Sequence, residues 1–255
     1  MKRPPDHEQR AASFKQLEKH CQQLEISPAQ QINLANIRHN KSVAPTISCF
    51  PESANACIDR VGGHPLVVVF GSAHKPGGGV RNGARAQEED LSLTTSWYFH
   101  VKDCDGFYKK EHPNLLYSDD ALYVKNALLL RDQYRNDIEP RSISMIGAAA
   151  PNLNGMRTSN KMVAEKVIYE TLERRIDGIL ALAHNNKHET VVFGAWGCGV
   201  FGLDPLKVAN VFKTCLEKPT YSGIVMFAIM DPAMCQVFEN VLKTPPLNAG
   251  FKGKK

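Results

Sequence analysis

The chain has 255 residues, of which 43% are hydrophobic and 22% are charged, as is typical of a soluble globular protein. This length suits one large domain, and a formal charge of +5 is too small for a protein that coats nucleic acid. Seven cysteines without a CxxC pair argue against a zinc ribbon or a disulfide framework. The N-terminal residues are polar and no 18-residue apolar run occurs, so we expect a cytoplasmic location and no membrane partner.

The first quarter of the chain carries no motif with a chemical meaning. Residues 1–12 are polar, and we expect them to be disordered or frayed. A helix is expected from Ser13, which would cap it, because apolar residues recur at helical spacing as far as Leu24. A short strand at 46–50 and a short helix at 52–61 are expected next.

From residue 66 the chain alternates between apolar strands and amphipathic helices. Strands are expected at 66–70, 122–130, 142–150, 191–193 and 223–230, and helices at 87–100, at 159–185, from 204 and at 232–242. This alternation predicts a three-layer α/β domain with a largely parallel sheet, which we place at 46–242. An N-terminal helical extension (1–45) would precede the domain, and a flexible basic tail (243–255) would follow it. In such sheets ligands bind beyond the carboxyl ends of the strands.

Two glycine-rich loops are expected at that edge of the sheet. Gly77-Gly78-Gly79 follows the strand at 66–70, and Gly197–Gly202, with GxGxxG spacing, follows the strand at 191–193. Neither loop is a GxxxxGK[ST] phosphate loop. Closely spaced backbone N–H groups at a helix start can nevertheless bind a diphosphate, whereas the alternative is a tight turn within a core.

An acidic cluster, Gln87-Glu88-Glu89-Asp90, opens the helix expected after the first glycine loop. Adjacent residues on a helix diverge by about 100°, so Glu88 and Glu89 should take different tasks. One would face the pocket, and the other would orient it or hold a sugar hydroxyl. The alternative is that these carboxylates only complement the helix dipole. A helix N-terminus lowers a carboxyl pKa, whereas a neighbouring carboxylate and a bound diphosphate would raise it towards the value that a general acid needs.

Two blocks of sequence together carry a family resemblance. PGGGVRNGARAQEEDL at 76–91 and GAWGCGVFGLDP at 194–205 resemble the blocks of microbial, bacterial-type poly(ADP-ribose) glycohydrolases, which are macrodomain enzymes. The resemblance, which covers about residues 45–240, implies a three-layer α/β/α macrodomain-like fold with a mixed, largely parallel central sheet. It implies hydrolysis of the ribose–ribose O-glycosidic bonds of poly(ADP-ribose), with release of ADP-ribose and without a metal or other cofactor.

The resemblance also implies roles for individual residues. Glu89 would be the catalytic acid and base, while Glu88 would hold ribose hydroxyls. The substrate would be contacted by Gly77, Gly78, Gly79, Val80, Gln87, Gly197, Cys198, Gly199, Val200, Phe201 and Gly202. Phe201 would pack against ribose, and Trp196 would be a packing residue of its own loop. Met230 would lie near adenine. A nucleophilic Cys198 is a weaker interpretation, because no histidine partner can be identified.

Two other functions are compatible with the same residues. The chain could be a mono-ADP-ribosyl hydrolase that acts on modified protein or nucleic acid, or a non-catalytic ADP-ribose-binding module. The intact pair of glutamates counts against the second possibility, since a binding module needs no acid. The expected partners are poly(ADP-ribose) or ADP-ribosylated protein and the ADP-ribose product, and we expect a monomer.

Overall fold

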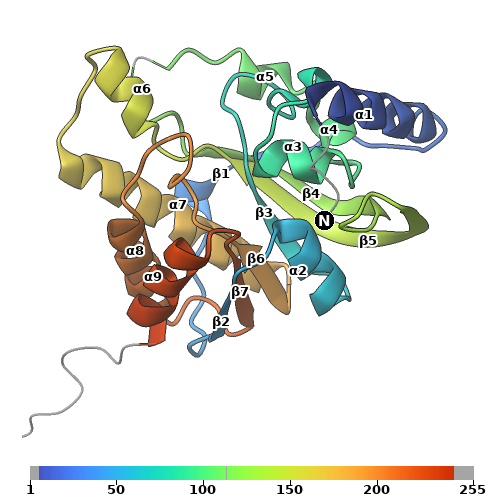
Figure 1. The fold of residues 1–255 in the computed structure, drawn as a ribbon. Coiled ribbons are helices and arrows are strands. Elements are labelled where there is room, and N and C mark those ends of the chain that lie inside the picture. Colours follow the sequence, from blue (N-terminus) through green and yellow to red (C-terminus); the bar gives the residue numbers. More distant parts are fainter. Residues whose placement is uncertain (1–5, 113, 244–255) are drawn as a thin grey trace, which may run out of the picture.

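The computed structural model describes residues 6–112 and 114–243 (Figure 1). Within them, seven strands form one mixed sheet in the order β1-β4-β5-β3-β6-β7-β2. The strands are β1 (Gln30–Asn33), β2 (Thr46–Phe50), β3 (Leu66–Phe70), β4 (Asp120–Arg131), β5 (Asp137–Ala148), β6 (Thr190–Phe193) and β7 (Ile224–Ala228). Strands β5, β3, β6, β7 and β2 are parallel neighbours, whereas β4 is antiparallel to both β1 and β5. The predicted mixed, largely parallel sheet is confirmed.

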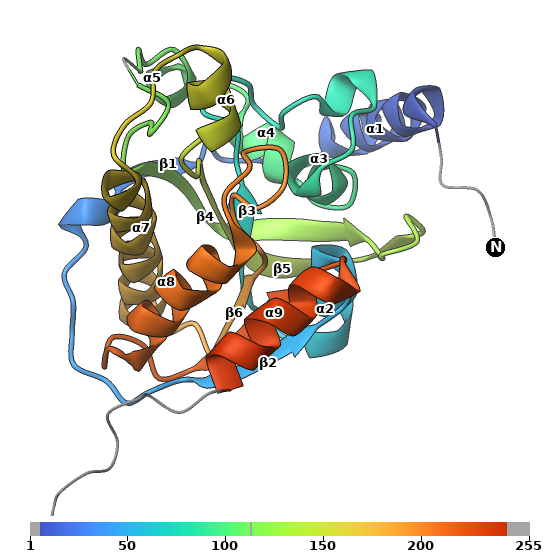
Figure 2. The same cartoon turned by 60° about the vertical axis from the view of Figure 1, so that its left-hand side comes forward.

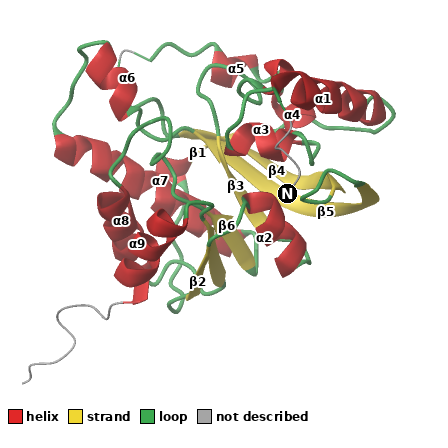
Figure 3. Ribbon diagram, in the orientation of Figure 1, coloured by secondary structure: helices red, strands yellow, loops and turns green. Residues whose placement is uncertain are grey.

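Helices cover both faces of the sheet (Figures 2 and 3). In the described residues they are α1 (His7–Cys21), α2 (Ala54–Val61), α3 (Gln87–Ser92), α4 (Trp97–Val101), α5 (Asp105–Tyr108), α6 (Leu153–Thr158), α7 (Glu165–Asn185), α8 (Pro205–Glu217) and α9 (Pro232–Lys243), with 3₁₀ helices η1 (Leu34–Asn36) and η2 (Val80–Asn82). Along β3, Leu66 and Val68 join the core under α7, α8 and α9, whereas Val67 and Val69 join the core under α2, α3 and α4. This alternation creates three layers and leaves the carboxyl end of β3 between them.

The start of the chain differs from the prediction. Helix α1 begins at His7, because the Asp6 side chain accepts a hydrogen bond from Gln9 N (2.8 Å) and caps it. The expected disorder is therefore wrong from residue 7, while residues 1–5 lie outside the described residues. Edge strand β1 was not expected. At the other end, Lys243 closes α9, and the rest of the predicted tail, 244–255, lies outside the described residues.

The helix predicted at 87–100 is two helices, α3 and α4. Between them Thr94 O accepts from Leu130 N (2.8 Å) and Ser96 N donates to Leu128 O (2.8 Å), so this segment pairs with β4. The Thr95 hydroxyl donates back to Leu91 O (2.7 Å), which helps to end α3. The short α3 consequently carries little besides the acidic cluster.

The long helix predicted at 159–185 also starts later, at Glu165. Ser159 instead ends α6, which is capped by Asn152 through a bond from Gly155 N (2.8 Å). The predicted start of α8 is confirmed, because the Asp204 side chain accepts from Lys207 N (2.9 Å) and caps the helix. No helix of the described chain is long and apolar enough to cross a membrane.

Candidate active site

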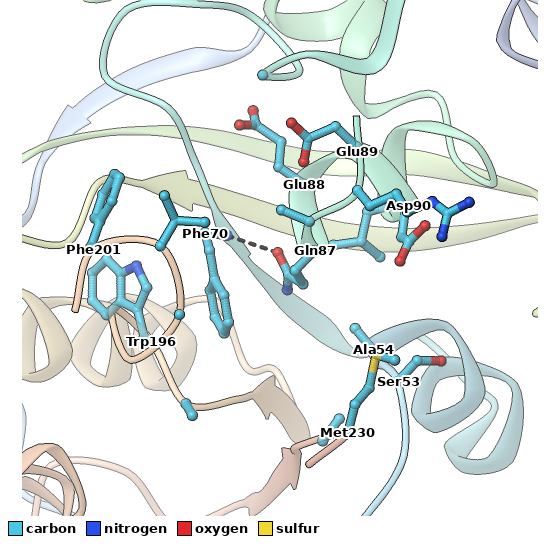
Figure 4. Close-up of a pocket in the computed structure, with 18 of the residues that line it drawn as sticks. Ser53, Ala54, Phe70, Gln87, Glu88, Glu89, Asp90, Trp196, Phe201 and Met230 are labelled. Carbon is cyan, nitrogen blue, oxygen red and sulfur yellow. Dashed lines mark hydrogen bonds between the residues drawn. The ribbon is translucent and has the colours of Figure 1, made fainter. Parts of the chain in front are cut away.

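A pocket of about 910 Å³ opens where β3, β6 and β7 end (Figure 4). Its wall includes Phe70 and Ser72 after β3, the loop after β6 from Ala195 to Phe201 without Cys198, and Met230 after β7. The first residues of α3 complete it. This volume lies near the top of the range for small-molecule sites, and the location is the one expected for an α/β sheet.

The pocket brings together most of the residues that the sequence suggested for the substrate. Those that line it are Gly78, Gly79, Gln87, Glu88, Glu89, Gly197, Gly199, Val200 and Phe201, together with Trp196 and Met230. Gly77, Val80, Cys198 and Gly202 do not line it. Val80 is buried in a cluster with Phe14, Leu93 and Tyr98. Burial raises the pKa of the Cys198 thiol to about 12, so a thiolate nucleophile is disfavoured there.

Glu88 is buried against the end of β3. Its Oε2 accepts a hydrogen bond from Ser72 N (2.8 Å), and its Oε1 accepts one from Trp97 Nε1 (3.3 Å). Burial raises the pKa of this carboxyl to about 8, and the charge of Glu89 adds to the shift. This direction of shift favours the protonated form of Glu88 at neutral pH.

Glu89 is fixed by the glycine loop itself. Its Oε1 accepts a hydrogen bond from Gly79 N (2.8 Å). A Cβ added at Gly78 would lie 2.4 Å from Glu89 Oε1 and 3.4 Å from Glu88 Oε2, so both carboxylates flank this residue. Gly78 has a φ of +58°, which glycine adopts without strain. The glycine loop thus creates the space into which the two carboxylates fit.

Gln87 ties the start of α3 to β3. Its Oε1 accepts from Phe70 N (2.9 Å) and its Nε2 donates to Val68 O (2.7 Å). The side-chain amide therefore bonds to the β3 backbone in the way that the backbone of a neighbouring strand does. Both polar ends of this side chain are therefore engaged by backbone. Although it lines the pocket, its clearest role is to set the position of the two glutamates that follow.

Comparison with known proteins agrees with this geometry. Residues 6–132 match the model of the microbial-type PARG, catalytic domain, where PARG denotes poly(ADP-ribose) glycohydrolase. The chain belongs to this family. No curated protein matches. The matched segment contains the Gly77–Gly79 loop and the acidic cluster, so the family assignment rests on the half of the chain that carries both glutamates.

Solved structures of two PARG enzymes cover nearly the whole chain. The Thermomonospora curvata enzyme bound to the inhibitor ADP-HPD is 25% identical with a TM-score of 0.78, over 91% of this chain and 99% of that one. The Deinococcus radiodurans enzyme in complex with ADP-ribose is also 25% identical, with a TM-score of 0.74, over 95% of this chain and 98% of that one. The similarity therefore extends well beyond residue 132, where the match to the family model ends.

Sequence reasoning missed residues that the fold brings to the PARG pocket from distant segments. Arg10 of α1 is almost fully buried; its Nη1 donates to Asp90 Oδ1 (2.7 Å), and its Nε donates to Ala84 O (3.0 Å). It joins the end of the glycine loop to the acidic cluster. One signal was present, since Arg10 lies one helical turn before Phe14 on the apolar side of α1, where a charge needs a partner.

The raised pKa of Glu88 predicts a pH-dependent stability. In the unfolded chain this carboxyl ionises near pH 4.5, so between pH 4.5 and about 8 the folded state binds more protons than the unfolded state. Stability then falls as pH rises through this interval, by about 1.4 kcal/mol for each unit of pKa difference. We expect the Tm of Glu88→Gln minus the Tm of the wild type to increase as pH rises from 4.5 to 8.

The control for this measurement is Glu139→Gln, which changes an exposed carboxylate on β5. Its difference in Tm from the wild type should stay constant over the same interval. A constant difference for Glu88→Gln would contradict the proposed protonation of Glu88.

Proposed function

We propose that this chain hydrolyses the ribose–ribose O-glycosidic bonds of poly(ADP-ribose) and releases ADP-ribose. The observation that carries the proposal is the pair Glu88 and Glu89, which flanks Gly78 in a pocket that the second glycine loop also lines, through Gly197 and residues 199–201. The family match and the solved relatives with ADP-ribose or an inhibitor support it.

The second glycine loop supplies donors for a diphosphate. Within the described residues, the backbone N–H groups of Gly199, Val200 and Phe201 make no hydrogen bond to protein, although the neighbouring Cys198 N and Gly202 N do. Three successive amides without a protein partner, in a loop that leads into α8, are donors of the kind that bind phosphate oxygens. We assign the diphosphate of the bound ADP-ribose unit to these amides.

The two glutamates then divide the chemistry. Glu89 gives a proton to the departing ribose oxygen as the C1″–O bond breaks and an oxocarbenium-like centre forms. Its carboxylate then takes a proton from the water that attacks C1″, which regenerates the acid. Glu88, protonated at neutral pH and fixed by Ser72 N and Trp97 Nε1, holds a ribose hydroxyl and sets the position of the scissile bond.

The proposal is tested with purified protein and three substrates. Poly(ADP-ribose) should be degraded to free ADP-ribose, as followed by chromatography of the products. A mono-ADP-ribosylated protein is the second substrate, and calorimetry with ADP-ribose measures binding alone. Release of ADP-ribose from the singly modified protein with an intact polymer, or binding without turnover of either substrate, would overturn the proposal.

A further inference from the structure

At the end of the pocket beside α3, two arginines share one carboxylate. Arg10 and Arg135 line the pocket there, next to Asp90. Asp90 Oδ1 already accepts from Arg10 Nη1 at 2.7 Å, while Arg135 Nη2 lies 3.6 Å from the same oxygen. Arg135 and Asp90 therefore form an ion pair, but their separation is too long for a hydrogen bond. This part of the pocket therefore attracts a further anion.

Arg135 occupies an unusual backbone position. It has a φ of +69°, which favours glycine or asparagine over arginine. The turn that holds it is well fixed, because Asp132 Oδ1 accepts from Tyr134 N (2.8 Å) and Asn136 N (2.9 Å). Gln133 N donates to Asp59 Oδ2 (2.9 Å), which fastens this β4–β5 turn to α2. An arginine kept at a strained position on a fixed turn indicates that its side chain has a use.

Two guanidinium groups at this end retain unused donors. Among the described residues the Arg135 side chain makes no hydrogen bond, although about three quarters of it is buried. Burial and the nearby Arg10, Arg85 and Arg131 lower the pKa of its guanidinium from the usual value, in spite of Asp90. Arg10 is 4% exposed, and its Nη2 has no hydrogen-bond partner in the described chain. Planar guanidinium groups match the oxygens of a phosphate in particular.

We infer that Arg135, with Arg10 behind it, forms a second phosphate subsite, which takes a phosphate of the neighbouring ADP-ribose unit of the polymer. This assignment rests on the proposed function, which gives the diphosphate of the cleaved unit to the Gly197–Gly202 loop. In Figure 4 Phe201 of that loop and Asp90 lie at opposite ends of the pocket, on either side of Glu88. If the diphosphate of the cleaved unit lies next to Phe201, the arginines beside Asp90 can bind a phosphate of the neighbouring ADP-ribose unit.

The test compares two ligands on a protein that binds without turnover. In a Glu89→Gln background, calorimetry measures Kd for ADP-ribose and for a short poly(ADP-ribose) oligomer of defined length. Arg135→Ala should weaken oligomer binding about tenfold more than ADP-ribose binding, which is the scale of one lost hydrogen bond to a charged group. The salt dependence of oligomer binding should also become shallower, since one phosphate contact is lost. Arg135→Lys, which keeps the charge, should recover part of both effects.

The matched control is Arg157→Ala, which removes an exposed arginine of α6 that does not line the pocket. It should change the two affinities equally little. An equal loss for ADP-ribose and oligomer in Arg135→Ala, or no loss for either, would overturn the second subsite. Failure of the proposed function is seen separately, because the wild-type chain would then leave the polymer intact.

Discussion

Glu89→Gln is expected to lower kcat on poly(ADP-ribose) by about a thousandfold, within the range for loss of a general acid–base group. Glutamine has the same shape, and its Oε1 can still accept the hydrogen bond from Gly79 N. It cannot give a proton to the leaving oxygen. ADP-ribose affinity should therefore stay within a few-fold of the wild type, with the two quantities measured by product release and by calorimetry.

A suitable control is Glu170→Gln, which neutralises an exposed glutamate on α7 that forms an ion pair with Lys166. Its kcat should match the wild type. If Glu89→Gln retained wild-type turnover, Glu89 would not be the proton donor, and the protonated Glu88 would be the next residue to replace.

Gly78→Ala is expected to lower kcat by about a hundredfold while costing only modest stability. The added Cβ would lie 2.4 Å from Glu89 Oε1, so the carboxylate must move and lose its bond to Gly79 N. A displacement of about 1 Å at a reacting group can cost a hundredfold in rate. The end of a glutamate side chain moves easily, so the stability loss should be about 1–2 kcal/mol, from the left-handed backbone alone.

Gly63→Ala separates these two effects. Gly63 also has a left-handed φ (+55°), but a Cβ there would meet nothing within 4 Å, and the residue does not line the pocket. Thermal unfolding should show a similar loss of stability in both variants, whereas only Gly78→Ala should lose turnover. Equal turnover in the two variants would mean that Gly78 does not place Glu89.

Local sequence was informative wherever an element depends on its own residues. The apolar run at 66–70 predicts β3 with its observed ends, and Asp204-Pro205 marks the start of α8. Prediction from local sequence failed where contacts with a distant segment determine the structure. The segment Thr94–Ser96 is not helical because its backbone forms hydrogen bonds with β4. No pattern within residues 87–100 indicates that pairing.

The site follows the same rule. The two glycine loops and Glu88-Glu89 are contiguous motifs, so their meeting at one pocket could be expected from strands that end at the same edge. Arg135 lies in a hairpin turn 45 residues beyond Asp90, and only the long β4–β5 hairpin brings it back over α3. The polar bonds of Gln87 to β3 were equally hidden, because a glutamine before two glutamates looks like a substrate contact.

The chain contains two tryptophans, and both belong to the pocket region. The Trp97 indole N–H donates to Glu88, while Trp196 lines the pocket and is fully buried. All indole emission of this protein therefore originates beside the two glutamates or in the second glycine loop. The colour and intensity of that emission depend on the surroundings of the ring. The unlabelled protein thus carries its own optical reporter, through which ligand entry and the ionisation of Glu88 can be followed in solution.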